Sequence, residues 1–225
     1  MNLERAKKSA AIEAANEITN GMLVGIGTGS TVFYFIEELI TRVKSGLKIK
    51  AVSSSNRSTE QAKKGGIELY PLVLLEKLDI TVDGTDEIDP ERRMIKGGGG
   101  ALLREKILAS CSDKLIIIAD SSKEVAQLGA QKVPVEILPF GFKATIAHLN
   151  SRGFFGFLRS TPSGEAFITD NNNYIYDIHY PNFVSNPELD HQKIINIPGV
   201  IETGFFFNVV TRLYLGDPNG NVIRK

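Results

Sequence analysis

Short strand-like runs that alternate with helical segments constrain the fold of this chain more than any other feature. Three of the runs, residues 22–26, 78–82 and 114–119, are rich in apolar residues and are bounded by glycine or by charge. Such runs are typical of strands that are buried on both faces of a parallel sheet. A further strand is expected at 48–53, and helical spacing is seen at 3–18, 31–44, 58–64 and 101–110. The alternation predicts an α/β fold with a mostly parallel sheet that is covered by helices on both faces.

The pattern changes near residue 127. Strands are expected at 133–138, 154–158, 174–179 and 200–206, with helices at 143–150 and 191–195. This order is that of a β-α-β-β-α-β, ferredoxin-like unit. We therefore expect an inserted α+β domain at 128–207. The first domain would comprise 1–127 and 208–225, with 209–215 returning to its sheet.

Charge and cysteine content exclude several classes of function. The 225 residues include 26 Lys and Arg and 26 Asp and Glu, so no overall positive field points to nucleic acid or to an anionic membrane. The single cysteine, Cys111, excludes an internal disulfide and a Cys-based zinc site, and we expect it to be a small buried hydrophobe.

No apolar run reaches the roughly 18 residues of a membrane span, and no signal peptide is seen. We predict a cytoplasmic protein that binds no metal, since His148, His179 and His191 have no ligand spacing.

A glycine-rich loop follows the first predicted strand. In Gly25-Ile-Gly-Thr-Gly-Ser30 the glycines permit a close approach of a ligand to the backbone. The N–H groups at the start of the next helix, with the hydroxyls of Thr28, Ser30 and Thr31, would suit a phosphate. The loop has neither the third glycine of the dinucleotide fingerprint nor the Gly-Lys-Ser/Thr of a Walker A loop. A plain strand–helix turn is the alternative.

Two further segments carry groups that suit acid–base chemistry. Asp83-Gly-Thr-Asp-Glu87 ends a buried strand, where ligands bind in open α/β sheets. Asp83 and Asp86 are the candidates there, whereas Glu87 and Asp89 are expected to be solvated. Lys96 precedes four glycines, Gly97 to Gly100, and Glu105 lies in the helix that follows. Taken alone, Glu105 would be a surface charge beside Arg104 and Lys106. Lys123, after the strand at 114–119, would usually be solvated as well.

The order and spacing of these segments resemble ribose-5-phosphate isomerase of the A type along nearly the whole chain. The matching blocks are Gly27-Thr-Gly-Ser-Thr31, Asp83-Gly-Thr-Asp-Glu-Ile88, Ile95-Lys-Gly-Gly-Gly99 with Leu103-Arg-Glu-Lys106, Ile118-Ala-Asp-Ser-Ser-Lys123, Ile168-Thr-Asp-Asn171 and Ile197-Pro-Gly-Val200. Two departures are visible. Gly100 stands where alanine is common, and Glu202-Thr-Gly-Phe-Phe-Phe-Asn208 is unusually aromatic.

The resemblance implies a Rossmann-like catalytic domain, 1–127 with 208–225, and an inserted ferredoxin-like α+β lid domain, 128–207. It implies interconversion of D-ribose 5-phosphate and D-ribulose 5-phosphate through an enediol(ate), in the non-oxidative branch of the pentose phosphate pathway. It implies no cofactor, and a homo-oligomer that is a dimer or a dimer of dimers. Glu105 would be the catalytic base, with Lys96, Asp83 and Asp86 assisting. The substrate-binding residues would be Thr28, Gly29, Ser30, Thr31, Asp83, Gly84, Thr85, Asp86, Lys96, Gly97, Gly98, Gly99 and Lys123.

Two other functions compete with this interpretation. A coenzyme A transferase has a related architecture and would use glutamate as a nucleophile, but it needs a large coenzyme pocket. A sugar-phosphate sensor would be non-catalytic and would normally carry a helix-turn-helix with a basic face, which the sequence does not indicate. For the homo-oligomer, we expect Phe205, Phe206 and Phe207 to expose apolar surface on a monomer unless the lid domain covers them.

Overall fold

The computed structural model describes residues 3–225 and divides them into two compact units. The first unit comprises the chain up to Thr85 together with Arg104–Lys123 and Val209–Lys225. The second comprises Asp86–Leu103 and Glu124–Asn208. Residues 86–103, 124–127 and 208 were expected in the first domain but group with the second unit. The short strand Met94–Ile95 pairs with Phe205–Phe206, and Ile95 and Val125 contribute to the second unit's core.

The first unit is built on a six-stranded sheet with the order β13-β12-β6-β3-β1-β2. All neighbouring strands are parallel except β13, which pairs antiparallel with β12 at the edge. The bounds are β1 Leu23–Ile26, β2 Lys50–Ser53, β3 Ile80–Asp83, β6 Leu115–Asp120, β12 Arg212–Gly216 and β13 Val222–Arg224. The central strands β3 and β6 are buried at every residue, as their apolar sequence predicts. The Rossmann-like sheet is therefore confirmed.

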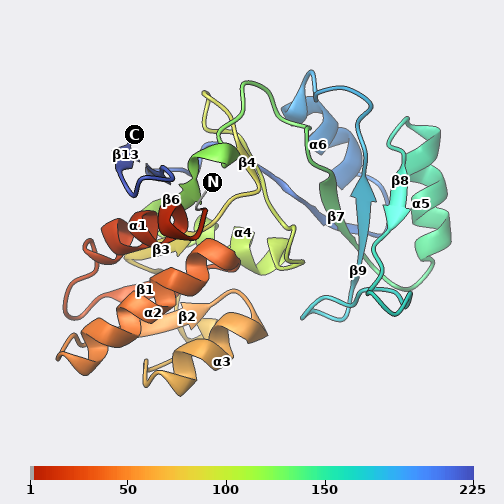
Figure 1. Ribbon diagram of the computed structural model, residues 1–225. Helices are drawn as coiled ribbons and strands as arrows, with labels where there is room; N and C mark the ends of the chain where they lie inside the picture. The colour runs from red at the N-terminus through yellow and green to blue at the C-terminus, as the bar shows by residue number, and fades with distance from the viewer. Residues whose placement is uncertain (1–2) are drawn as a thin grey trace. The chain divides into compact units, whose positions relative to one another are not determined.

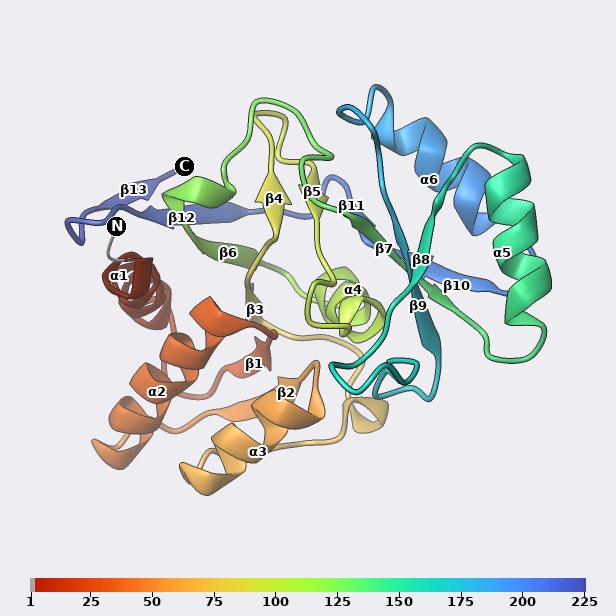
Figure 2. The same ribbon diagram turned by 45° about the vertical axis from the view of Figure 1, so that its right-hand side comes forward.

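Helices cover both faces of this sheet because its strands alternate side chains between two cores (Figures 1 and 2). The helices are α1 Leu3–Ala15, α2 Ser30–Lys44, α3 Asn56–Lys64 and α4 Leu102–Ser110, with 3-10 turns η1 Leu72–Leu74 and η2 Ser121–Lys123. Ala51 of β2 packs into the larger core with α1 and α2. Its neighbour Val52 points the other way and packs with Leu108 of α4.

The second unit contains a four-stranded antiparallel sheet with the order β10-β7-β9-β8. Its elements in chain order are β7 Val133–Ile137, α5 Phe142–Ser151, β8 Gly156–Leu158, β9 Tyr174–Ile178, α6 Pro187–Ile195 and β10 Val200–Thr203. This is the strand order of a ferredoxin-like unit. Leu149 of α5 and Ile194 of α6 share one core with the sheet, and Figure 2 shows both helices on the same face.

A second, three-stranded sheet in this unit has the order β11-β5-β4 and was not expected from the sequence. Its strands are β4 Glu87–Ile88, β5 Met94–Ile95 and β11 Phe205–Phe206. The single strand expected at 200–206 is thus two strands in different sheets, separated by Gly204. Phe205 and Phe206 are buried, and Phe207 is only partly exposed. These three rings therefore do not expose a large apolar area; the second unit covers them, which is the alternative that the sequence left open.

No helix among residues 3–225 is long and apolar enough to cross a membrane.

Candidate active site

The carboxyl edge of the first unit's sheet brings several of the predicted residues together. The parallel strands β1, β3 and β6 end beside one another, and Thr28, Asp83 and Lys123 lie at or just after these ends. This is the edge where ligands bind in open α/β sheets. Gly84 and Thr85 continue from β3 and are partly exposed, as is Lys123 at the end of η2.

Asp83 is held in place by the glycine loop. Its side chain is 1% exposed, and its Oδ1 accepts from the N–H of Thr28 at 3.1 Å and from that of Gly84 at 2.7 Å. A Cβ atom at Gly27 would lie 2.0 Å from the same oxygen. Gly27 is therefore required for the approach of β1 to the Asp83 carboxylate, which fixes the orientation of this group.

The start of α2 is suited to bind an anion. The helix begins at Ser30, its N-cap Gly29 has no side chain to satisfy the first N–H groups, and its first turn carries no acidic residue. Thr31 is buried, Ser30 is exposed, and the Thr28 hydroxyl lies 2.7 Å from Ser54 Oγ. A phosphate group fits a site with these donors.

Lys7 is a further residue of this cradle that the sequence analysis missed. Its Nζ donates to Ser30 Oγ at 2.9 Å, across 23 residues of sequence. Nothing in the pattern of α1 separates Lys7 from its neighbour Lys8; only the packing of α1 beside α2 identifies it. Lys7 supplies the positive charge that the loop itself lacks.

Glu105 lies in the first turn of α4 and is only 4% exposed. Taken alone, it was expected to be a surface charge, and that expectation was wrong. Its neighbour Arg104 donates to Asn56 Oδ1 at 3.4 Å, and Asn56 begins α3 shortly after β2 ends. The start of α4 is thereby located at the carboxyl edge of the sheet. A buried carboxylate at this edge is a candidate for proton transfer.

Asp86, Lys96 and the glycines form a second group of candidate residues, all within the second unit. Asp86 precedes β4, and its Oδ2 accepts from the N–H of Gly98 at 2.7 Å. Lys96 follows β5 and is 3% exposed; its N–H donates to Gly204 O at 2.9 Å, and its Nζ lies 5.5 Å from the centre of the Phe206 ring. Gly97 is buried, whereas Gly98 and Gly99 are exposed. A buried lysine thus directly precedes the glycine loop, and the Asp86 carboxylate accepts from one N–H group of that loop.

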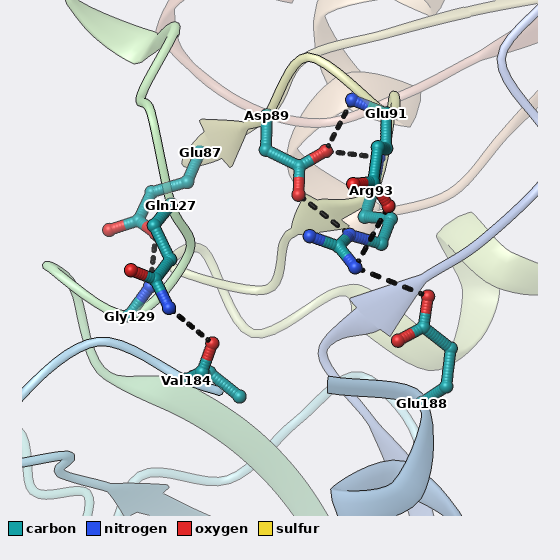
Figure 3. A network of polar contacts seen from close by, with 8 residues as sticks. All are labelled: Glu87, Asp89, Glu91, Arg93, Gln127, Gly129, Val184 and Glu188. Atoms are coloured by element: carbon teal, nitrogen blue, oxygen red, sulfur yellow. Dashed lines mark hydrogen bonds and ion pairs between the residues drawn. The ribbon is translucent and has the colours of Figure 1, made fainter. Parts of the chain in front are cut away.

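Glu87 and Asp89 are structural, and the expectation that they are solvated was wrong (Figure 3). Glu87 is 1% exposed and accepts from the N–H groups of Gly129 and Gln131. Asp89 is 3% exposed and accepts from Arg93 Nε at 2.6 Å and from the N–H of Glu91 at 3.0 Å. Both carboxylates are used to hold loops of the second unit.

The structure also places the cysteine and the histidines considered in the sequence. No group of three or more His, Cys, Asp or Glu that could hold a metal is found among residues 3–225. Cys111 is only partly buried, not fully buried as expected, and this partial burial raises the pKa of its thiol, so that it stays protonated at neutral pH. His191 Nδ1 lies 2.7 Å from Thr203 Oγ1, a contact within the second unit.

A family model for ribose 5-phosphate isomerase A (phosphoriboisomerase A) matches residues 50–220 of this chain. The chain belongs to the ribose 5-phosphate isomerase A family. Among curated relatives, ribose-5-phosphate isomerase A of Protochlamydia amoebophila is 45% identical over 96% of this chain and 93% of its own length. The same enzyme of Chlamydia caviae is 48% identical over 97% and 94%, respectively.

Solved structures of ribose 5-phosphate isomerases have the same fold. The enzyme from Plasmodium falciparum superposes with a TM-score of 0.95 at 38% identity, covering 99% of this chain and 98% of its own. A D-ribose-5-phosphate isomerase in complex with phospho-erythronic acid gives a TM-score of 0.94 at 35% identity, covering 100% and 99%. The resemblance inferred from the motifs is therefore confirmed.

Proposed function

We propose that this chain interconverts D-ribose 5-phosphate and D-ribulose 5-phosphate, with Glu105 as the base. Membership of the ribose 5-phosphate isomerase A family supports the reaction. The observation that carries the assignment of the base is the burial of Glu105 at the sheet edge, on the helix that follows the glycine loop. The reaction belongs to the non-oxidative branch of the pentose phosphate pathway.

The chemistry requires one proton to move between two carbons and another between two oxygens. In the aldose-to-ketose direction, Glu105 takes the C2 proton, and the resulting enediol(ate) receives a proton at C1. Lys96 stabilises the negative charge that develops on the sugar oxygen. Asp83 and Asp86 transfer protons between the sugar oxygens and assist ring opening. Each of these two aspartates has one carboxylate oxygen oriented by a backbone N–H.

The phosphate is assigned to the start of α2. Its oxygens would accept from the N–H groups and hydroxyls of the segment from Thr28 to Thr31, with Lys7 as the counter-ion. Lys123, Gly84 and Thr85 would complete the substrate contacts. Phospho-erythronic acid, which is bound by a related enzyme, combines a phosphate with a carboxylate, and a carboxylate shares the planar, delocalised charge of an enediolate. We expect it to inhibit this protein competitively.

The test is ketose formation from ribose 5-phosphate in deuterated buffer. Ultraviolet absorbance measures the ketose, and NMR measures the loss of the C2 hydrogen signal of ribose 5-phosphate. We expect turnover with exchange of the C2 hydrogen, and unchanged activity after exhaustive EDTA treatment. Activity that EDTA abolishes and Mg²⁺ or Zn²⁺ restores would contradict the metal-free mechanism. A coenzyme A transferase would instead form an acyl-enzyme with an acyl-CoA, which hydroxylamine traps, and a sensor would bind the sugar phosphate without turnover.

We also propose a cytoplasmic homo-oligomer, most simply a C2 dimer. Phe205 and Phe206 do not support it, since they are buried. The support comes from Phe140, Phe155 and Phe157 of the second unit, which are 88%, 62% and 54% exposed. Sedimentation of the purified protein as a stable monomer at micromolar concentration would contradict this proposal.

A further inference from the structure

A buried ion pair in the second unit lies outside the predicted site. Arg159 follows β8, and Asp177 belongs to β9; their side chains are 9% and 0% exposed. Arg159 Nε donates to Asp177 Oδ2 at 2.8 Å, and Nη2 donates to Oδ1 at 2.5 Å. This two-pronged pairing locks the plane of the guanidinium group. Burying two charges is costly, and a buried ion pair can often be replaced by apolar residues without loss of stability. Stability alone therefore does not explain this pair, and the remaining contacts of Arg159 indicate another role.

The third nitrogen of Arg159 contacts the glycine loop. Nη1 donates to Gly97 O and to Gly98 O, both at 3.0 Å, across 62 and 61 residues of sequence. Gly97 and Gly100 have φ values of 99° and 81°, which other residues rarely adopt. A run of glycines has many accessible conformations. The Arg159 guanidinium stabilises the conformation in which the carbonyl groups of Gly97 and Gly98 both point toward it.

This orientation sets the direction of the loop's N–H groups. In a trans peptide the C=O and N–H bonds point in opposite directions. The peptide that joins Gly97 to Gly98 is thus held at both ends, by Arg159 at its oxygen and by Asp86 Oδ2 at its nitrogen, 2.7 Å away. The next peptide also turns its oxygen to Arg159, so the N–H of Gly99 points away from Arg159, as that of Gly98 does.

We propose that Arg159, itself oriented by Asp177, is a positioning residue that holds the glycine loop in its reactive conformation. Through the loop it orients the Asp86 carboxylate and fixes the backbone that follows Lys96. The inference rests on the proposed function, because Asp86 and Lys96 are the groups assigned to the sugar oxygens. Arg159 itself touches no assigned substrate residue other than the two glycine carbonyls.

The pair offers a matched control. Lys132 Nζ also donates to Asp177 Oδ2, at 2.7 Å, but contacts no carbonyl of the loop in the described bonds. Lys132→Met therefore removes a cation from the same carboxylate without releasing the loop. Arg159→Lys keeps the charge but cannot span the carboxylate and two carbonyls at once.

The experiment compares kcat, KM and thermal unfolding for wild type, Arg159→Lys, Asp177→Asn and Lys132→Met. We expect kcat to fall about 10- to 100-fold in Arg159→Lys, since misplacement of reacting groups by about 1 Å costs up to about 100-fold. KM should change less than kcat, because the phosphate is assigned to α2. Asp177→Asn should show a smaller fall in kcat, and Lys132→Met should stay within twofold of wild type.

Arg159→Ala should regain activity with millimolar guanidinium but not with methylammonium.

Hydrogen exchange of the Gly97–Gly100 amides, followed by mass spectrometry, tests the inference independently of activity. The exchange should quicken in Arg159→Lys and not in Lys132→Met. If the wild-type protein had no isomerase activity, the proposed function would be contradicted, but the amide exchange would still test the positioning role of Arg159. A folded Arg159→Lys with normal kcat and normal exchange would overturn the positioning role. If Arg159→Ala does not fold, Arg159→Lys and Asp177→Asn decide the matter by the same measurements.

Discussion

The two groups of candidate residues are built in different ways. In the first unit, Thr28, Asp83 and Lys123 follow strands of one sheet, and the parallel pairing alone places them at a common edge. In the second unit, Asp86 and Lys96 flank strands of two residues each, and their glycine loop is held by an arginine more than 60 residues away. The first group depends on regular secondary structure, whereas the second depends on a tertiary network of side chains. Substitutions should distinguish the two.

The largest effect is expected in the first unit, from Glu105→Gln. The amide keeps the size of the side chain but cannot accept the substrate proton. General-base catalysis is typically worth ~10²–10⁴-fold, so kcat should fall on that scale while KM changes little. Exchange of the C2 hydrogen with deuterated solvent should be almost lost. The matched control is Glu60→Gln, since the Glu60 side chain is 72% exposed on α3. Near-normal exchange in Glu105→Gln would assign the base to another residue, with Asp83 the next candidate.

A second substitution tests whether every polar network of the second unit serves the site. The motif Ile168-Thr-Asp-Asn171 resembles a family block, yet Thr169 Oγ1 and Asn171 Nδ2 both donate to the fully buried Glu136 Oε1, at 3.0 Å each. Thr169→Val removes this donor, along with the acceptor used by the N–H groups of Asn171 and Asn173. Leaving buried groups without partners typically costs about 1–3 kcal/mol.

We therefore expect Thr169→Val to lower the free energy of unfolding by about 2 kcal/mol and to leave kcat near the wild-type value. Urea denaturation and steady-state kinetics measure the two quantities. Thr161→Val, which alters a hydroxyl bonded to Ser163 and to the carbonyl of Glu165 near the surface, is the control. A fall in kcat comparable to that of Arg159→Lys would show that this block acts on the site and not only on stability.

Lys7→Met probes the cradle of the first unit. Loss of the cation that contacts Ser30 should weaken phosphate binding and raise KM about tenfold, equivalent to about 1.4 kcal/mol, with kcat nearly unchanged. The control is Lys8→Met, because Lys8 is the adjacent, exposed lysine on α1. Inhibition by inorganic phosphate should weaken in parallel with KM. If both lysine variants raised KM equally, the effect would be one of general charge and not of a specific contact.

These contrasts also explain what the sequence could predict. The two larger sheets were foreseen except for the edge strand β13, since buried parallel strands and a β-α-β-β-α-β order have strong local patterns. The sheet of β4, β5 and β11 was missed, because strands of two residues have no periodicity to detect. The charged neighbours of Glu105 in the sequence indicated a surface position when the residue was taken alone, because burial is decided by the packing of α4. Lys7 and Arg159 were missed for a common reason: each acts through a contact with a residue distant in sequence.

Gly100 is the place where the loop of the second unit departs from the alanine that the family resemblance led us to expect, and it gives the smallest predicted effect. A Cβ atom there would lie 2.5 Å from Phe167 Cε1, and the φ of 81° already disfavours other residues. The Phe167 ring stands 5.6 Å from the guanidinium carbon of Arg159, so displacing the ring would disturb the group that holds the loop.

Gly21→Ala supplies the comparison from the first unit, because Gly21 has a φ of 86° with nothing within 4 Å of the added carbon. Backbone strain of this kind costs roughly 1–2 kcal/mol in both variants. The difference between their unfolding free energies, about 1 kcal/mol by analogy with overpacked cores, isolates the clash with Phe167. Phe167→Leu should relieve that difference when combined with Gly100→Ala, and should do nothing for Gly21→Ala. Equal unfolding free energies for the two alanine variants would mean that Phe167 yields without cost and that the glycine is required only for its backbone conformation.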